Sequence, residues 1–149
     1  MNKMIYNVRN REETIAVGEK IGRGLSAGDI VCITGDLGAG KTVIASGIAK
    51  GLGVKETEYI TSPTFTIVNE YSGTIPFFHF DVYRVHDPEG LYEIGFDEYF
   101  TAGGVVCIEW ANLIYDLIPG KYININLSKI NKADCENARE IIITGDICL

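Results

Sequence analysis

The sequence predicts an α/β protein: a mainly parallel sheet flanked by helices, with an antiparallel hairpin at its C-terminal end. Short apolar runs alternate with helical patterns along the chain, which is the order expected for a parallel sheet with crossover helices. Ile30–Thr34 is a continuous apolar run, typical of a strand buried on both faces of such a sheet. With 149 residues, 46% of them hydrophobic, residues 1–149 are expected to form one domain around a single core.

The first elements along the chain are predicted to be a strand and a helix. Met4–Val8 is a candidate edge strand. Asn10 and Glu13 form a capping-box pattern that indicates a helix start. Gly28 follows the expected helix end. The residues that fall on one face of this helix are Ile15, Gly18, Ile21, Gly22 and Leu25.

A second helix is expected from about Lys41 to Lys50, ended by Gly51 and Gly53. Three further apolar runs then predict strands. They are Thr66–Tyr71, Phe77–Asp81 and Val105–Glu109.

The remaining predicted elements are a short helix and a hairpin. Asp87-Pro88-Glu89 reads as an N-cap, a first-turn proline and an acidic first turn. Apolar residues alternate with polar ones from Ile123 to Leu127, and Ile141–Thr144 is a second strand pattern. Because the segment between these two strands is polar and turn-like, we expect an antiparallel hairpin.

The composition excludes several classes of protein. The formal net charge of −7 argues against a chain that grips a phosphate backbone on its own, because that affinity comes largely from Lys and Arg. The four cysteines, Cys32, Cys107, Cys135 and Cys148, show no C-x-x-C spacing, which favours structural thiols over a metal site. No apolar run approaches the ~20 residues that span a bilayer, and the N-terminus lacks the apolar run of a signal peptide. A soluble, cytoplasmic protein is expected.

One motif predicts nucleotide binding. It fits G-x-x-x-x-G-K-[ST] without a mismatch, and it lies between a buried-strand pattern and a helix pattern. Glycines let several backbone N–H groups face one anion, and the helix start adds its positive end. The lysine would reach the phosphates, and the threonine hydroxyl would bind Mg²⁺. The sequence therefore predicts a P-loop NTPase that binds a Mg²⁺–nucleotide, most simply ATP, through Gly35, Asp36, Leu37, Gly38, Ala39, Gly40, Lys41 and Thr42.

Two acidic residues are candidates for the second Mg²⁺ ligand. Asp81 and Glu109 each end an apolar strand pattern, and both strand ends can lie beside residues 35–42, the predicted phosphate loop. Spacing alone does not rank them. Trp110 is the only tryptophan and is equally consistent with a core role or with stacking beside the nucleotide. His79, flanked by phenylalanines, is expected to be a satisfied core histidine.

Two alternatives to an ATPase remain open. Asn131–Asp134 spells N-K-x-D and Asp87–Gly90 spells D-x-x-G, the motif order of small GTPases. We interpret both as coincidence, because neither is predicted to follow the end of a buried strand. A small-molecule kinase would share the phosphate loop, but the 13 Lys and Arg show no arginine-rich lid.

Several motifs together give a resemblance to a known family. The chain closely resembles the TsaE family (older name YjeE) over about residues 12–110, whereas the last third matches only in its strand pattern. The motifs, in order, are GDLGAGKT at 35–42, SPTFT at 62–66, NEY at 69–71, HFDVYR at 79–84, DPE at 87–89, GFDEYF at 95–100 and IEW at 108–110.

The resemblance implies a function. Members of this family bind ATP and Mg²⁺ with a P-loop fold, hydrolyse ATP slowly alone, and act with the partner proteins TsaD and TsaB. Those partners transfer a threonylcarbamoyl group to an adenosine beside the anticodon of tRNA, and the ATPase resets them between turnovers. The resemblance thus implies that tRNA is met only through the complex and that no membrane is involved.

The resemblance also implies residue roles. Lys41 would clamp the phosphates, Thr42 and Glu109 would bind Mg²⁺, and Asp81 would be the second essential acid. Trp110 would lie near the nucleotide. The segment that would sense the γ-phosphate as a switch consists of Ser62, Pro63, Thr64, Phe65 and Thr66.

Overall fold

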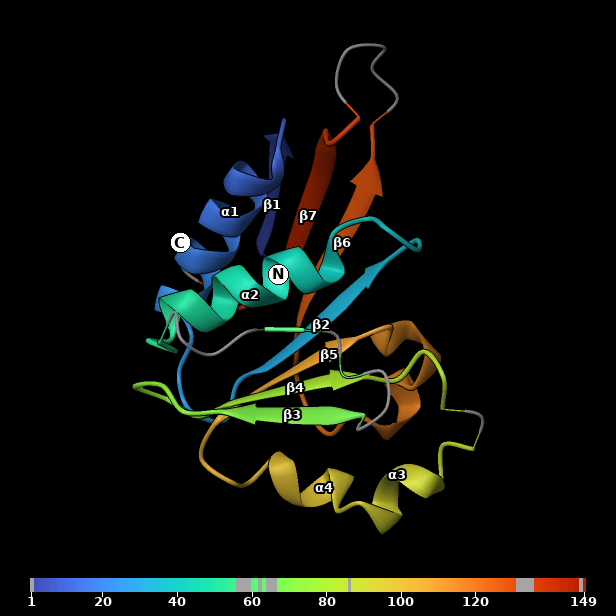
Figure 1. The fold of residues 1–149 in the computed structure, drawn as a ribbon. Helices are drawn as coiled ribbons and strands as arrows, with labels where there is room; N and C mark the ends of the chain where they lie inside the picture. Colours follow the sequence, from blue (N-terminus) through green and yellow to red (C-terminus); the bar gives the residue numbers. More distant parts are fainter. Residues whose placement is uncertain are drawn as a thin grey trace.

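The computed structural model describes residues 2–55, 60–61, 63, 67–85, 87–130, 136–147 and 149. These residues form one seven-stranded sheet with helices on both faces (Figure 1). The strands are β1 (Asn2–Val8), β2 (Ile30–Gly35), β3 (Val68–Tyr71), β4 (Phe77–Asp81), β5 (Val105–Glu109), β6 (Ile123–Lys129) and β7 (Arg139–Gly145). The helices are α1 (Arg11–Arg23), α2 (Lys41–Gly51), α3 (Gly90–Glu93) and α4 (Phe96–Tyr99), with 3₁₀ turns η1 (Ala111–Leu113) and η2 (Tyr115–Leu117).

The sheet is mixed rather than mainly parallel, and this corrects the sequence expectation. Its strand order is β1-β7-β6-β2-β5-β4-β3. The four central strands, β6, β2, β5 and β4, pair in parallel. Both edges are antiparallel, because β3 forms a hairpin with β4 on one side and β7 returns beside β6 and then pairs with β1 on the other. The predicted C-terminal hairpin and the predicted edge position of β1 are confirmed.

Helix α1 starts where the capping box predicts and ends earlier than expected. The Asn10 side chain accepts the Glu13 N–H at 2.9 Å, and the Glu13 carboxylate accepts the Arg9 N–H at 3.1 Å. Gly24 is the C-cap, so the chain between α1 and β2 is longer than the placement of Gly28 suggested. The predicted apolar face nevertheless lies inward.

One face of the sheet is covered by α1 and α2, which pack backbone to backbone. A Cβ added to Gly18 would lie 2.5 Å from the Ile44 carbonyl oxygen, and one added to Gly47 would lie 2.4 Å from that of Ile15. Real Cβ contacts do not come this close, so glycine is required at both positions. This packing fixes the start of α2, and with it the phosphate loop, against the sheet.

The opposite face carries the one-turn elements α3, α4, η1 and η2, around an aromatic core. Phe80 meets Phe96 edge to face at 5.2 Å between ring centroids. The helix predicted at Asp87–Glu89 begins two residues later, at Gly90, because the Asp87 side chain and carbonyl first close a turn on Glu89 and Gly90. Among the described residues, no helix is both long and apolar enough to cross a membrane.

Candidate functional site

Most of the predicted binding and catalytic residues line one cleft of about 450 Å³ at the carboxyl ends of β2, β4 and β5. Gly35, Asp36 and Ala39 belong to the same loop but are not part of the cleft lining. This edge is where open α/β sheets bind ligands. A larger cleft of about 630 Å³, between η2 and the β6–β7 strands, holds none of the predicted residues. The cleft of about 450 Å³ is lined by Leu37, Gly38, Gly40, Lys41, Thr42, Val43, Asp81, Tyr83, Arg84, Glu109 and Trp110.

The phosphate loop connects β2 directly to α2, as the motif predicts. Gly35 and Gly40 have φ of 147° and 106°, in the region that favours glycine. A Cβ on Gly35 would also lie 2.5 Å from the Leu127 carbonyl oxygen of β6. Gly40 caps α2 without a side-chain hydrogen bond. The first N–H groups of α2 are therefore presented to the cleft, an arrangement that favours an anion.

Lys41 lies across its own loop. Its Nζ donates to the carbonyl oxygens of Gly35 at 2.8 Å and Asp36 at 2.7 Å. It also lies 4.0 Å from the centroid of the Trp110 ring, a cation–π distance. Burial lowers the pKa of Lys41, and the negative charges of Glu109, Asp81 and Asp36 act in the opposite direction. The ammonium is thus held at the cleft by two backbone carbonyl oxygens and an aromatic ring, none of which carries a net charge.

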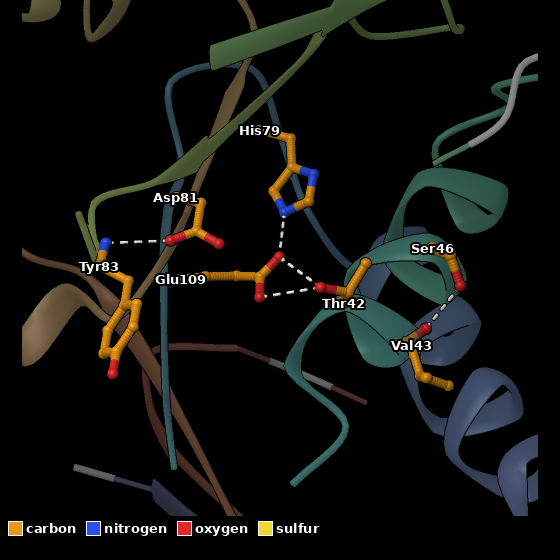
Figure 2. Close-up of polar contacts among 7 residues, drawn as sticks. All are labelled: Thr42, Val43, Ser46, His79, Asp81, Tyr83 and Glu109. Carbon is orange, nitrogen blue, oxygen red and sulfur yellow. Dashed lines mark hydrogen bonds and ion pairs between the residues drawn. The ribbon is translucent and has the colours of Figure 1, made fainter. Parts of the chain in front are cut away.

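Thr42 and Glu109 meet across the cleft. The Thr42 hydroxyl lies 3.0 Å from each oxygen of the Glu109 carboxylate and donates its proton to that group (Figure 2). Glu109 is only 2% exposed. Of the two acids that spacing could not rank, Glu109 is the one that contacts the loop threonine.

Asp81 lies beside Glu109 in the register of β4 and β5. Its Oδ1 accepts the Tyr83 N–H at 3.0 Å (Figure 2). The Asp81 side chain is half-buried and lines the cleft, so both predicted acids face the same space from neighbouring strands. The structure brings them together, and their separate roles stay predictions.

These oxygens suit Mg²⁺ better than a metal with soft ligands. A hydroxyl and a carboxylate are hard donors, and Mg²⁺ in nucleotide sites uses one or two protein oxygens together with phosphates and water. Within the part of the chain that the structure describes, no group of three or more His, Cys, Asp or Glu could hold a metal by itself. The donor set fits a cation that arrives with a nucleotide.

Trp110 lines the cleft, although part of its surface packs on the neighbouring core. Its φ of 63° is unusual for a non-glycine residue. The Tyr83 ring lies against the indole at 4.4 Å between centroids. The indole therefore sits between Tyr83 and the Lys41 ammonium, and whether it contacts a base stays a prediction.

The sequence did not single out Val43 and Tyr83 of the cleft lining, nor two residues outside the lining that contact it. His79, expected to be a satisfied core histidine, is fully buried, but its Nε2 lies 2.5 Å from Glu109 Oε2 and its Nδ1 has no partner among the described residues. Arg139 at the start of β7 donates to the carbonyl oxygens of Ala39 at 3.0 Å and Gly38 at 3.3 Å. Neither contact has a local sequence signal, because each joins strands or loops far apart in the chain.

The predicted switch lies mostly outside the described residues. Of Ser62–Thr66, the structure describes only Pro63, which is buried and whose carbonyl oxygen accepts the Ile67 N–H at 3.0 Å. Ile67 has a φ of 68°, and β3 begins after it rather than at Thr66.

The expectation that neither GTPase-like motif follows the end of a strand holds for one motif and not for the other. Asp87 lies in a turn, well beyond the end of β4 at Asp81, as expected. Asn131–Asp134 falls outside the described residues, but the strand before it, β6, runs to Lys129. The argument that no strand end precedes this motif is therefore wrong. Pairing of β6 with β7 continues through Ser128 and Lys129, beyond the point where the apolar alternation stops.

Comparisons with known proteins agree on one family. The model of the family described as "Threonylcarbamoyl adenosine biosynthesis protein TsaE" matches residues 8–141. A Bacillus subtilis (strain 168) protein named tRNA threonylcarbamoyladenosine biosynthesis protein TsaE is 39% identical over 146 residues, or 97% of this chain and 87% of the relative. A protein of the same name from Nostoc sp. is 40% identical over 124 residues, or 80% and 74%. The crystal structure of Bacillus subtilis YdiB superposes with a TM-score of 0.77 at 36% identity, covering 97% of this chain and 86% of that chain.

Proposed function

The chain belongs to the TsaE family of tRNA threonylcarbamoyladenosine biosynthesis, and from that premise we propose that it is the ATP-binding, ATP-hydrolysing accessory protein of that pathway. It acts with TsaD and TsaB, and it meets tRNA only through the complex that they form. The net charge of −7 supports indirect binding of tRNA, because a partner must then supply the cationic surface that contacts the tRNA phosphates. The α/β sheet with a phosphate loop between β2 and α2 supports a P-loop NTPase fold.

The observation that carries the proposal is the contact between Thr42 and Glu109. These residues are far apart in sequence, yet their oxygens lie 3.0 Å apart at the mouth of the phosphate loop. Such a pair is what a Mg²⁺–nucleotide requires from a P-loop protein. A glycine-rich turn that matched the motif by chance would not place a buried carboxylate on the motif threonine.

Each residue then has a distinct task. Lys41 exchanges the two carbonyl oxygens that it now contacts for the phosphates of ATP, which are stronger partners because they are charged. Thr42 and Glu109 hold Mg²⁺, which neutralises phosphate charge when it is bound. Asp81, beside Glu109, orients the attacking water or supports the metal.

Hydrolysis is expected to be slow without partners. Phosphoryl transfer is mostly positioning and charge stabilisation, and switch NTPases leave part of that work to another protein. Arg84 is an exposed arginine that lines the cleft, and it forms no ion pair with a described residue. It is the one arginine in the cleft lining, so further cationic stabilisation is expected from the complex.

The experiment that tests the proposal measures hydrolysis of ATP and of GTP, with and without purified TsaD and TsaB. We expect slow ATP turnover alone and a stimulation of about tenfold or more with both partners, or ~1.4 kcal/mol of barrier. Lys41→Ala is the matched negative control. Turnover that TsaD and TsaB do not stimulate would reject the proposed role with these partners. A strong preference for GTP would reject the ATPase and favour a GTPase.

A further inference from the structure

His79 is a polar side chain in an otherwise apolar strand. It is fully buried in β4 beside Phe77, Phe78 and Phe80, and its ring stacks on that of Phe77 at 5.9 Å between centroids. Burial of an imidazole has a free-energy cost unless its polar atoms are hydrogen-bonded. Its Nδ1 has no partner among the described residues, so only a hydrogen bond of Nε2 can offset this cost. An apolar residue would suit the packing at this position better.

Among the described residues, the His79 side chain makes one polar contact, and that contact is to the site. Its Nε2 lies 2.5 Å from Glu109 Oε2, while the Thr42 hydroxyl lies 3.0 Å from both Glu109 oxygens (Figure 2). The carboxylate is therefore held from two elements, β4 and α2. Because a carboxylate accepts hydrogen bonds, the imidazole tautomer that fits carries its hydrogen on Nε2. A long glutamate side chain has little freedom left between these two donors.

We propose that His79 is a positioning residue for Glu109: its Nε2–H fixes Oε2 and thereby keeps Oε1 at Thr42, where the divalent cation of the nucleotide is held. The inference rests on the proposed function, because it takes Glu109 as a Mg²⁺ ligand. His79 itself touches neither cation nor nucleotide, since it is fully buried and does not line the cleft. Groups that orient a metal ligand in this way set metal affinity even though they lie outside the coordination sphere.

The test uses two substitutions of His79 in the full chain. His79→Gln places an amide N–H₂ near the position of Nε2 and can donate to Glu109, whereas His79→Leu fills a similar volume and cannot. The measurement is the Mg²⁺ concentration needed for half-maximal tight binding of a fluorescent ATP analogue. We expect a rise of roughly tenfold to a hundredfold for His79→Leu and much less for His79→Gln. Binding of the same analogue in excess EDTA should be equal in all three proteins.

Two further measurements separate positioning from a structural role. Thermal unfolding without nucleotide should show His79→Leu to be folded with a Tm close to that of wild type, because removal of the unpartnered Nδ1 offsets the loss of the Nε2 hydrogen bond to the buried Glu109 carboxylate. Nitrogen-15 NMR of nucleotide-free wild type should show His79 with its hydrogen on Nε2, and Glu109→Gln should shift that signal. The spectroscopic result does not require either His79 variant to fold.

The outcomes are distinguishable from those of the proposed function. If wild type binds the analogue without any Mg²⁺ dependence, the metal role of Glu109 fails and so does the inference. If wild type depends on Mg²⁺ and His79→Leu matches it, only the inference is overturned. An Nδ1–H tautomer in wild type, or a glutamine variant as impaired as the leucine variant, also overturns it.

Discussion

The two walls of the cleft at the carboxyl ends of β2, β4 and β5 are built in opposite ways. The loop wall, residues 35–42, is one continuous segment whose glycines and helix start set its shape. The acid wall combines Asp81, Glu109 and Trp110 from the ends of β4 and β5, which are joined only by strand pairing. The loop wall presents N–H groups and an ammonium, and the acid wall presents carboxylates and an indole.

Two contacts bridge these walls, and both start from adjacent residues of the motif. Lys41 reaches the Trp110 ring and Thr42 reaches the Glu109 carboxylate. A local motif can therefore be complete in sequence yet functional only if the strand register brings the second wall to it. On the proposed function, the loop wall would bind the nucleotide, and the acid wall would govern the metal and the reaction.

The largest expected effect comes from the loop wall. Lys41→Ala removes the ammonium that donates to the Gly35 and Asp36 carbonyl oxygens of the loop, so we expect at least a hundredfold loss of ATP hydrolysis, or roughly 3 kcal/mol. Steady-state hydrolysis and equilibrium binding of ATP both measure it. Lys50→Ala is the control, since Lys50 lies at the other end of α2 with a side chain that is 52% exposed. Full turnover in the Lys41 variant would contradict the assignment of the phosphate loop.

The acid wall should separate binding from reaction. We expect Glu109→Ala and Asp81→Ala each to slow hydrolysis by about tenfold or more, at least ~1.4 kcal/mol. Glu109→Ala should also weaken the Mg²⁺ dependence of nucleotide binding, because Glu109 alone of the two contacts Thr42 through a hydrogen bond. Mg²⁺ titration of nucleotide binding measures this. If the Glu109 variant titrates like wild type and the Asp81 variant does not, the ligand assignment must be exchanged.

A smaller effect on ATP binding is expected from loss of Arg139, which hydrogen-bonds to the backbone of the loop wall. Arg139 donates to the carbonyl oxygens of Gly38 and Ala39 from β7. Arg139→Ala should weaken ATP binding by about threefold to tenfold, because hydrogen bonds from a charged group contribute roughly 1–2 kcal/mol and the loop keeps its glycine geometry. Calorimetric titration with ATP measures it. Arg23→Ala, which removes an exposed arginine from α1, should leave ATP binding unchanged.

Much of the fold was predictable because it follows local patterns. The apolar runs gave β4 and β5 with their observed bounds, and the capping box gave the start of α1. The elements α4, η1 and η2 were missed because helices of one turn depend on packing, as Phe96 does on Phe80. The number of antiparallel edges was missed because strand order is not encoded in any single strand.

The site likewise combines features that follow local sequence patterns with features that depend on strand pairing. The loop motif could be predicted residue by residue, whereas spacing could not show which acid contacts Thr42. The register of β4 and β5 places Asp81 beside Glu109, and the hydrogen bond from Thr42 to Glu109 distinguishes them. The contact of His79 with Glu109 depends on that same register. The role of Arg139 depends on where the C-terminal hairpin returns, which no spacing in the sequence specifies.

The smallest expected effect concerns base selection, which neither wall explains. Asp134 belongs to the N-K-x-D motif, and because β6 ends at Lys129 the motif does follow a strand. In a GTPase such an aspartate pairs with the guanine, and its loss costs a large factor in selectivity. If the two walls bind mainly phosphate and Mg²⁺, Asp134→Ala leaves the ratio of kcat/KM for ATP and GTP unchanged. Asp146→Ala is the matched control, since it removes an equal charge from an exposed side chain near the C-terminus. A strong GTP preference in wild type that disappears only in the Asp134 variant would show that a third region, the sequence segment that follows β6, selects guanine.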